Sequence, residues 1–84
     1  MPLYMDIHEN IPTGTTAADV AGAHEMDLKI QEQHGVEYRS YWVSEADGKI
    51  FCLVEAPDPE AAATVHRESH GLVADQLIEV VEGR

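Results

Sequence analysis

The fold is decided by the stretch Glu37-Tyr38-Arg39-Ser40-Tyr41-Trp42-Val43-Ser44-Glu45-Ala46-Asp47-Gly48-Lys49-Ile50-Phe51-Cys52-Leu53-Val54-Glu55-Ala56. Residues 37–44 are rich in aromatic and β-branched side chains, and residues 50–56 form a second apolar run. The Asp47-Gly48 pair between the two runs is the strongest short-range signal for a hairpin. We therefore predict two antiparallel strands, 37–44 and 50–56.

Both faces of the second predicted strand carry apolar residues. Ile50, Cys52 and Val54 alternate with Phe51 and Leu53, whereas a strand with one face in water alternates apolar and polar residues. We expect this strand to be central in its sheet and covered on both faces. Because Cys52 shares the side of Ile50 and Val54, we interpret it as a small buried core residue rather than a ligand or a nucleophile.

Upstream of the hairpin, the sequence predicts one strand and one helix. Residues 3–8 alternate between apolar and polar side chains, which is the period of a strand. Thr15 or Thr16 is a suitable helix N-cap, and Gly35 is a suitable helix stop. We expect a helix from about Ala17 to His34.

Downstream of the hairpin, the sequence predicts a second helix and a last strand. Asp58 can cap a helix that begins with Pro59 and ends at about His70, before Gly71. The apolar residues of segment 76–82 predict the last strand, from about Gln76 to Glu82.

The resulting order is β-α-β-β-α-β, which is the order of a ferredoxin-like α+β sandwich. We expect residues 1–84 to form a single domain of this kind. A four-stranded antiparallel sheet would carry both helices on one face, and its other face would be free to dimerise.

The composition restricts the partners of the chain. Its 84 residues include 16 Asp and Glu against five Lys and Arg, which gives a formal net charge of −11. That charge argues against nucleic acids and anionic membranes as partners and favours cations. A chain this short buries only about 60–65% of its unfolded surface, so a homodimer is expected.

The sequence carries no signal for export or membrane insertion. Residues 1–6 lack a basic region followed by an apolar run, and no stretch approaches the roughly 20 apolar residues of a membrane span. The single cysteine, Cys52, excludes an intrachain disulfide and is compatible with a reducing compartment. We expect a soluble, cytoplasmic protein.

The first predicted helix places two metal-type side chains on its inner face. At about 100° per residue, His24 and Asp27 lie in the middle of the stripe that faces the sheet. An unpaired carboxylate is strongly unfavourable there unless it takes up a proton. Asp27 therefore needs a partner, which is either a protein group (His24, Arg39 or Tyr41) or a bound cation.

The second predicted helix carries His66 and His70 one turn apart on its inner face. A His-x-x-x-His pair can hold one metal ion, and two histidines in ordinary hydrogen bonds fit the same spacing. Because the two helices lie side by side in the predicted fold, their inner side chains can meet at one ion. The candidate metal ligands are His24, Asp27, His66 and His70, with His8 and Asp6 at the end of the first strand as a fifth and a sixth.

The sequence also resembles a small bacterial family of domains of unknown function, about this long, some of which are described as nickel-binding proteins. The resemblance covers nearly the whole chain and lies in the segments Tyr4-Met5-Asp6-Ile7-His8, Ala23-His24-Glu25-Met26-Asp27, His34-Gly35-Val36, Phe51-Cys52-Leu53-Val54-Glu55-Ala56-Pro57 and Val65-His66-Arg67-Glu68-Ser69-His70-Gly71. It implies a ferredoxin-like fold, a homodimer that binds nickel, and a role in nickel sequestration or tolerance.

Three functions remain open at the level of sequence. The first is a non-catalytic protein that binds nickel or a similar divalent ion, which suits imidazole and carboxylate ligands without a cysteine cluster. The second is a dimeric α+β barrel enzyme, a monooxygenase or isomerase, in which His24 and Asp27 form an acid-base pair. A sizeable apolar cavity ending at His24 would favour the enzyme. The third is a structural dimer whose inner histidines satisfy one another.

Overall fold

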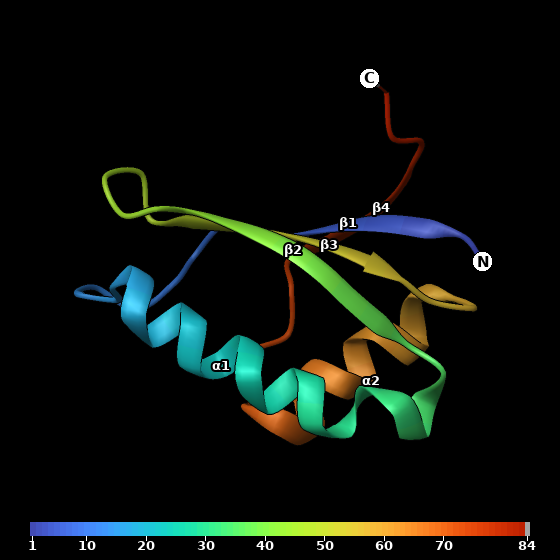
Figure 1. Ribbon diagram of the computed structural model, residues 1–84. Helices are drawn as coiled ribbons and strands as arrows, with labels where there is room; N and C mark the ends of the chain where they lie inside the picture. The colour runs from blue at the N-terminus through green and yellow to red at the C-terminus, as the bar shows by residue number, and fades with distance from the viewer. Residues whose placement is uncertain (84) are drawn as a thin grey trace.

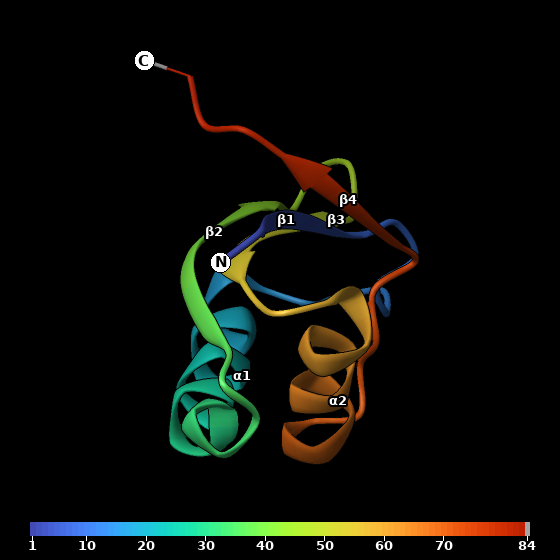
Figure 2. The same ribbon diagram turned by 90° about the vertical axis from the view of Figure 1, so that its right-hand side faces the viewer.

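The hairpin predicted from residues 37–56 forms the middle and one edge of a four-stranded sheet. The computed structural model describes residues 1–83 and has the elements β1 (Leu3–His8), α1 (Ala17–Ile30), a 3₁₀ helix (Gln31–His34), β2 (Glu37–Ser44), β3 (Lys49–Glu55), α2 (Pro59–Ser69) and β4 (Gln76–Val80). The strand order is β2-β3-β1-β4, and every neighbouring pair is antiparallel. Both helices lie on one face of the sheet (Figure 1), side by side when seen from the end (Figure 2). The predicted ferredoxin-like α+β fold is confirmed.

The β2-β3 hairpin closes at a turn in which glycine is required. Gly48 has a φ of 67°, in the left-handed region that side chains with a Cβ rarely adopt. Its N–H donates to the Ser44 carbonyl oxygen at 2.9 Å. Lys49 then pairs with Ser44, so β3 begins one residue earlier than predicted.

A register shift in β2 decides which aromatic side chains reach the core. Tyr38 lies opposite Val54 and Ser40 lies opposite Leu53, so β2 has one more residue than β3 over this stretch. Two strand residues three positions apart normally point to opposite faces. The extra residue lets both Tyr38 and Tyr41 approach the helices, where each contacts a histidine ring.

The helix and strand ends differ from the predicted ones for local reasons. The α-helix α1 ends at Ile30 rather than His34, because its last turn tightens into the 3₁₀ helix before Gly35, which has a φ of 65°. Helix α2 ends at Ser69, with His70 as its C-cap. Strand β4 ends at Val80 rather than Glu82, since Val80 already pairs with Leu3, the first residue of β1.

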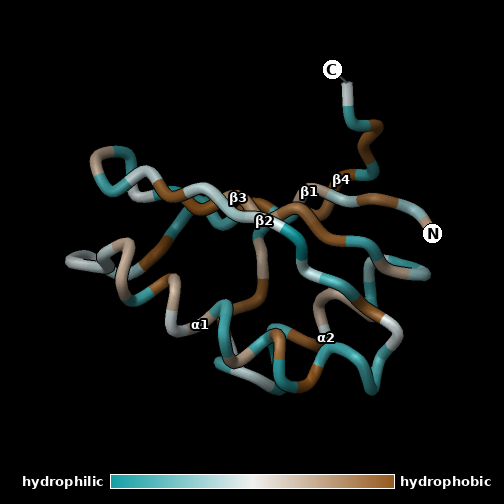
Figure 3. Tube along the Cα trace, viewed as in Figure 1, coloured by the Kyte–Doolittle hydropathy of each residue, from teal (hydrophilic) through white to brown (hydrophobic). Residues whose placement is uncertain are grey.

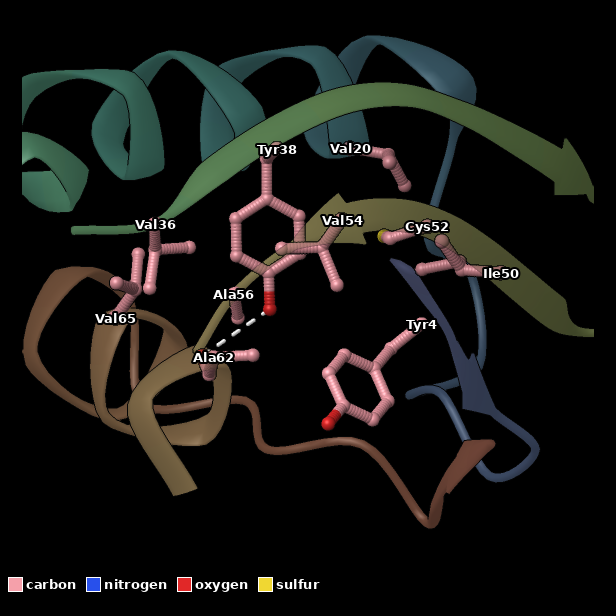
Figure 4. Close-up of a cluster of buried hydrophobic side chains, with 10 residues drawn as sticks. All are labelled: Tyr4, Val20, Val36, Tyr38, Ile50, Cys52, Val54, Ala56, Ala62 and Val65. Carbon is pink, nitrogen blue, oxygen red and sulfur yellow. Dashed lines mark hydrogen bonds between the residues drawn. The ribbon is translucent and has the colours of Figure 1, made fainter. Parts of the chain in front are cut away.

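The buried core lies between the sheet and the helices and contains polar as well as apolar side chains. Figure 4 shows its apolar part, which contains Tyr4, Val20, Val36, Tyr38, Ile50, Cys52, Val54, Ala56, Ala62 and Val65. Asp6, His8, Asp27 and His66 are buried beside it. In Figure 3, apolar segments lie along the strands, whereas the helices alternate between apolar and polar residues. A thin core thus surrounds a set of titratable groups.

The face of the sheet that points away from the helices is apolar and has no element of residues 1–83 over it (Figures 1 and 2). The register aligns Trp42 with Phe51, and it places Met5 between Leu53 and Ile78. Trp42 is 52% exposed and Ile78 is 45% exposed. β3 is central, as predicted, but no helix or strand of residues 1–83 covers its second face. No helix among the described residues is long and apolar enough to cross a membrane.

Candidate metal centre

Four buried side chains from β1, β3 and α2 meet beneath the helices. Asp6, His8, Cys52 and His66 each offer one ligand atom, and these atoms all lie within 4.8 Å of one another. Asp6 and Cys52 lie directly opposite each other in the register of β1 and β3, and His8 is two residues further along the inner side of β1. His66 lies on the buried side of α2. We call these four residues the inner cluster.

The carboxylate of Asp6 is the centre of the inner cluster. Its Oδ1 atom lies 3.0 Å from His8 Nε2, and its Oδ2 atom lies 2.8 Å from His66 Nε2. The Tyr38 hydroxyl donates to Oδ2 at 2.8 Å and has the Ala62 carbonyl oxygen as a second acceptor at 3.1 Å.

Two of these atoms are close to their neighbours but poorly aligned with them. Asp6 Oδ1 and His66 Nε2 are buried and form no hydrogen bond of good geometry with the described residues, although Oδ1 lies 3.0 Å from His8 Nε2 and His66 Nε2 lies 2.8 Å from Asp6 Oδ2. Buried polar atoms almost always have a partner, and a missing partner often indicates an ion or a water. The inner cluster therefore has the form of a ligand set.

A second group shares His66 and surrounds Asp27. His66 Nδ1 lies 3.0 Å from Asp27 Oδ1, His70 Nε2 lies 3.2 Å from the same oxygen, and the Ser69 hydroxyl also donates to it. Asp27, His66 and His70 also lie within ligand distance of one another. We call these three residues the Asp27 cluster.

The Asp27 cluster is already engaged in hydrogen bonds. The Leu72 N–H donates to His70 Nδ1 at 3.1 Å, so the proton of a neutral His70 ring lies on Nε2. That nitrogen then donates to Asp27 and has no lone pair for a metal. The inner cluster is consequently the better ligand set, and Asp27 acts on it through His66.

The electrostatics of the two clusters support a charged His66. Burial raises the pKa of Asp6 and of Asp27, but the adjacent imidazoles outweigh burial and hold both pKa values well below their usual range. Burial lowers the pKa of His66, but the two carboxylates outweigh it and raise that pKa to about 9. Burial, with the nearby Asp6 carboxylate, raises the pKa of the Cys52 thiol and the Tyr38 hydroxyl. Without a metal, the site is thus an imidazolium between two carboxylates.

A cavity of about 280 Å³ opens onto both clusters. Its lining contains His8, Cys52 and His66 from the inner cluster together with Asp27 and His70. Apolar side chains, including Val20 from α1 and Ile50 from β3, provide most of its surface, and further polar residues such as Asp19 and Asp75 also line it. Three of the four inner-cluster residues, His8, Cys52 and His66, therefore line the cavity although each is at most 7% exposed.

Comparison with known proteins identifies the family. The family described as "Nickel responsive protein SCO4226-like" matches residues 4–80. The chain belongs to this family. A crystal structure of SCO4226 from Streptomyces coelicolor A3(2) matches with 34% sequence identity and a TM-score of 0.86, over 98% of this chain and 99% of that one. No protein of curated function matches the chain.

Five of the six candidate ligands predicted from sequence lie in the two clusters, which share His66. Asp6 and His8 belong to the inner cluster, Asp27 and His70 belong to the Asp27 cluster, and His66 belongs to both. His24 belongs to neither group among the described residues. Its ring packs on Tyr41 of β2, with 4.9 Å between ring centroids, and it lines the cavity.

Three side chains of the site, Cys52, Tyr38 and Ser69, are not predicted from the sequence. Cys52 was interpreted as a core residue, and it is one, yet its sulfur also lies within ligand distance of Asp6 and His66. Tyr38 and Ser69 donate hydrogen bonds to Asp6 and Asp27 respectively. Asp6 and His8 are two residues apart, so they lie on the same face of their strand. Because antiparallel pairing aligns residues of one face across neighbouring strands, this spacing was the feature that could have indicated Cys52 as their neighbour.

Proposed function

We propose that this protein binds a divalent transition metal, nickel in particular, at the inner cluster and holds it without catalysis. The observation that carries the proposal is the convergence of four buried ligand atoms, from Asp6, His8, Cys52 and His66, within 4.8 Å of one another. The SCO4226-like family is described as nickel responsive. A nickel-responsive protein with a buried ligand set is suited to sequester the ion and so to provide tolerance.

The ligand chemistry supports the assignment of His66 Nε2 as a ligand. Metal-bound histidines usually donate their other ring N–H to a carboxylate, which fixes the tautomer and makes the ligand more basic. His66 Nδ1 has such a partner in Asp27 Oδ1, at 3.0 Å. Imidazole suits nickel, and the thiolate of Cys52 would add a soft ligand.

Metal and protons compete for this site. The pKa of His66 is raised to about 9, so at neutral pH the ring carries a proton on each nitrogen. Only the Nε2 proton has to leave for metal binding. The Cys52 thiol, whose pKa is raised by burial and by Asp6, gives up its proton if its sulfur becomes a ligand. Metal uptake therefore releases protons, and acid weakens it.

We also propose a homodimer that forms through the open face of the sheet. Trp42, Phe51 and Ile78 belong to this apolar face, and Trp42 and Ile78 are each about half exposed. Exposed apolar patches on small proteins commonly mark an interface. We place the protein in the cytoplasm, where a single buried cysteine stays reduced.

Nickel titration of tag-free, metal-depleted protein tests the proposed function. Calorimetry and native mass spectrometry should show a tight class of one nickel ion per chain in the natural sequence and in the control His34→Gln. His34 is a suitable control because it pairs with Glu68, away from both clusters. The His66→Gln variant should lose the tight class. Uptake that is equal in all three proteins, or no uptake above non-specific binding, would contradict the proposal.

A second candidate function is favoured by the cavity. An enzyme of the dimeric α+β barrel kind needs a substrate space between helices and sheet, and a cavity of about 280 Å³ lies there. Its acid-base pair would be His70 and Asp27, 3.2 Å apart, because His24 packs on Tyr41 instead. Incubating the protein with a cell extract, and following small molecules by mass spectrometry, tests this candidate. Consumption that His70→Gln abolishes would support an enzyme, and no consumption would argue against it.

A further inference from the structure

We propose that the cavity above the two clusters is a binding site for a small organic amine with an apolar body of one or two rings. This inference goes beyond metal binding. It rests on the size of the cavity, the hydrogen-bonding state of Asp27 and the charges that line the space.

The cavity is large enough for a ring and is mainly apolar at its walls. Its volume of about 280 Å³ is nearly twice the roughly 150 Å³ of an apolar protein cavity that takes up benzene. The segment between α2 and β4 forms part of the wall with Leu72 and Val73, which are 46% and 42% exposed. Two exposed apolar side chains beside a cavity gain burial when an apolar guest enters.

The cavity lining includes a carboxylate oxygen with spare capacity to accept a hydrogen bond. Asp27 lines the cavity and is only 2% exposed. Its Oδ1 atom accepts from His66 and Ser69 and lies 3.2 Å from His70 Nε2. Its Oδ2 atom accepts one long hydrogen bond, from His70 Nε2 at 3.4 Å. A carboxylate oxygen can accept two hydrogen bonds. Oδ2 can therefore accept an N–H from a guest.

The charges around the cavity select a cation over an anion. The described residues that line it include three aspartates (Asp19, Asp27 and Asp75) and no lysine or arginine. Its cationic group is the His66 imidazolium, which lies between the Asp6 and Asp27 carboxylates, so carboxylates still outnumber it in the lining. The ring of Tyr41 also lines the space, and an aromatic face attracts ammonium groups. An ammonium group next to an apolar body matches this lining, and a carboxylate or phosphate does not.

Amine binding does not depend on the metal. The guest would use Asp27 Oδ2 and the apolar walls, whereas the proposed metal ligands are Asp6, His8, Cys52 and His66. The two proposals can thus fail separately: Asp6→Asn changes a proposed metal ligand that does not line the cavity, so it should weaken metal uptake and leave amine binding intact.

Binding of three matched probes to metal-depleted protein tests the proposal. Benzylamine is the expected ligand, benzyl alcohol is its neutral isostere, and benzoate is the anionic control. Calorimetry and amide NMR shifts at residues 20 and 73 should show benzylamine binding at least about tenfold more tightly than benzyl alcohol, as for a charge-assisted hydrogen bond. Benzoate should not bind. Equal affinity for amine and alcohol, or no saturable binding below about 10 mM, would overturn the proposal.

Two variants locate the binding site. Ala23 lines the cavity, so Ala23→Phe should fill the space and abolish benzylamine binding. Ala18→Phe, at an exposed position of the same helix, should leave it unchanged. Asp27→Asn should bring the affinities for amine and alcohol within about threefold of each other. Benzylamine binding retained in folded Ala23→Phe protein would place the amine elsewhere and overturn the proposal.

Discussion

Nickel uptake by the inner cluster should release about two protons per ion at pH 7.5. One comes from His66 Nε2, because a pKa of about 9 keeps the ring almost fully protonated at this pH. The other comes from the Cys52 thiol, whose pKa is raised by burial and by the nearby Asp6. A surface histidine with an ordinary pKa of about 6.5 would release only about 0.1 proton.

The proton count is measurable by calorimetry in buffers with different ionisation enthalpies that do not chelate nickel. The slope of the observed binding enthalpy against the buffer ionisation enthalpy gives the number of protons released. We expect a slope of about two for the natural sequence and about one for Cys52→Ala, since the variant retains His66. A slope near zero would refute the reasoning, because it would mean that nickel binds away from the buried imidazolium.

Three further predictions concern affinity, stability and assembly. Replacing Asp27 with Asn should weaken nickel binding about 10- to 100-fold in the same titration, because His66 loses the carboxylate that orients it. The stability of the metal-free protein, followed by urea unfolding, should be highest at about pH 5–6.5. Above this range it should fall by up to about 3 kcal/mol as His66 deprotonates through pH 9, and below it stability should fall as Asp6 and Asp27 become protonated. A constant stability from pH 6 to 10 would contradict the charged state of His66. Replacing Trp42 and Ile78 together with Glu should convert a dimer to a monomer in analytical ultracentrifugation, and an unchanged dimer would place the interface elsewhere.

The hairpin and the caps made most of the fold predictable from sequence. Asp47-Gly48 requires a turn, and Thr16 and Asp58 both cap helices as expected, through hydrogen bonds to the N–H groups of Asp19 and Ala61. The ends of elements were less predictable. The last turn of α1 depends on the competition between α and 3₁₀ hydrogen bonds before Gly35, which composition does not determine.

The site was predictable where the periodicity of a strand or helix determines the direction in which a side chain points. Asp6 and His8 share one side of β1, and His66 and His70 share one side of α2, so these pairs meet as expected. Periodicity places His24 and Asp27 on one face of α1, but it does not show where α1 crosses its neighbours. Asp27 contacts α2, whereas His24 lies against Tyr41 of β2. Cys52 could not be separated from the core, because it is both buried beside Ile50 and close to Asp6.

A crystal structure of tag-free, nickel-loaded protein with data collected at the nickel absorption edge tests the central claim most directly. The account predicts an anomalous peak at bonding distance from His66 Nε2 and Asp6, with His66 Nδ1 still donating to Asp27. An anomalous peak bound only by surface groups, with Asp6 and His66 in contact as in the metal-free chain, would contradict the assignment of the inner cluster as the metal site.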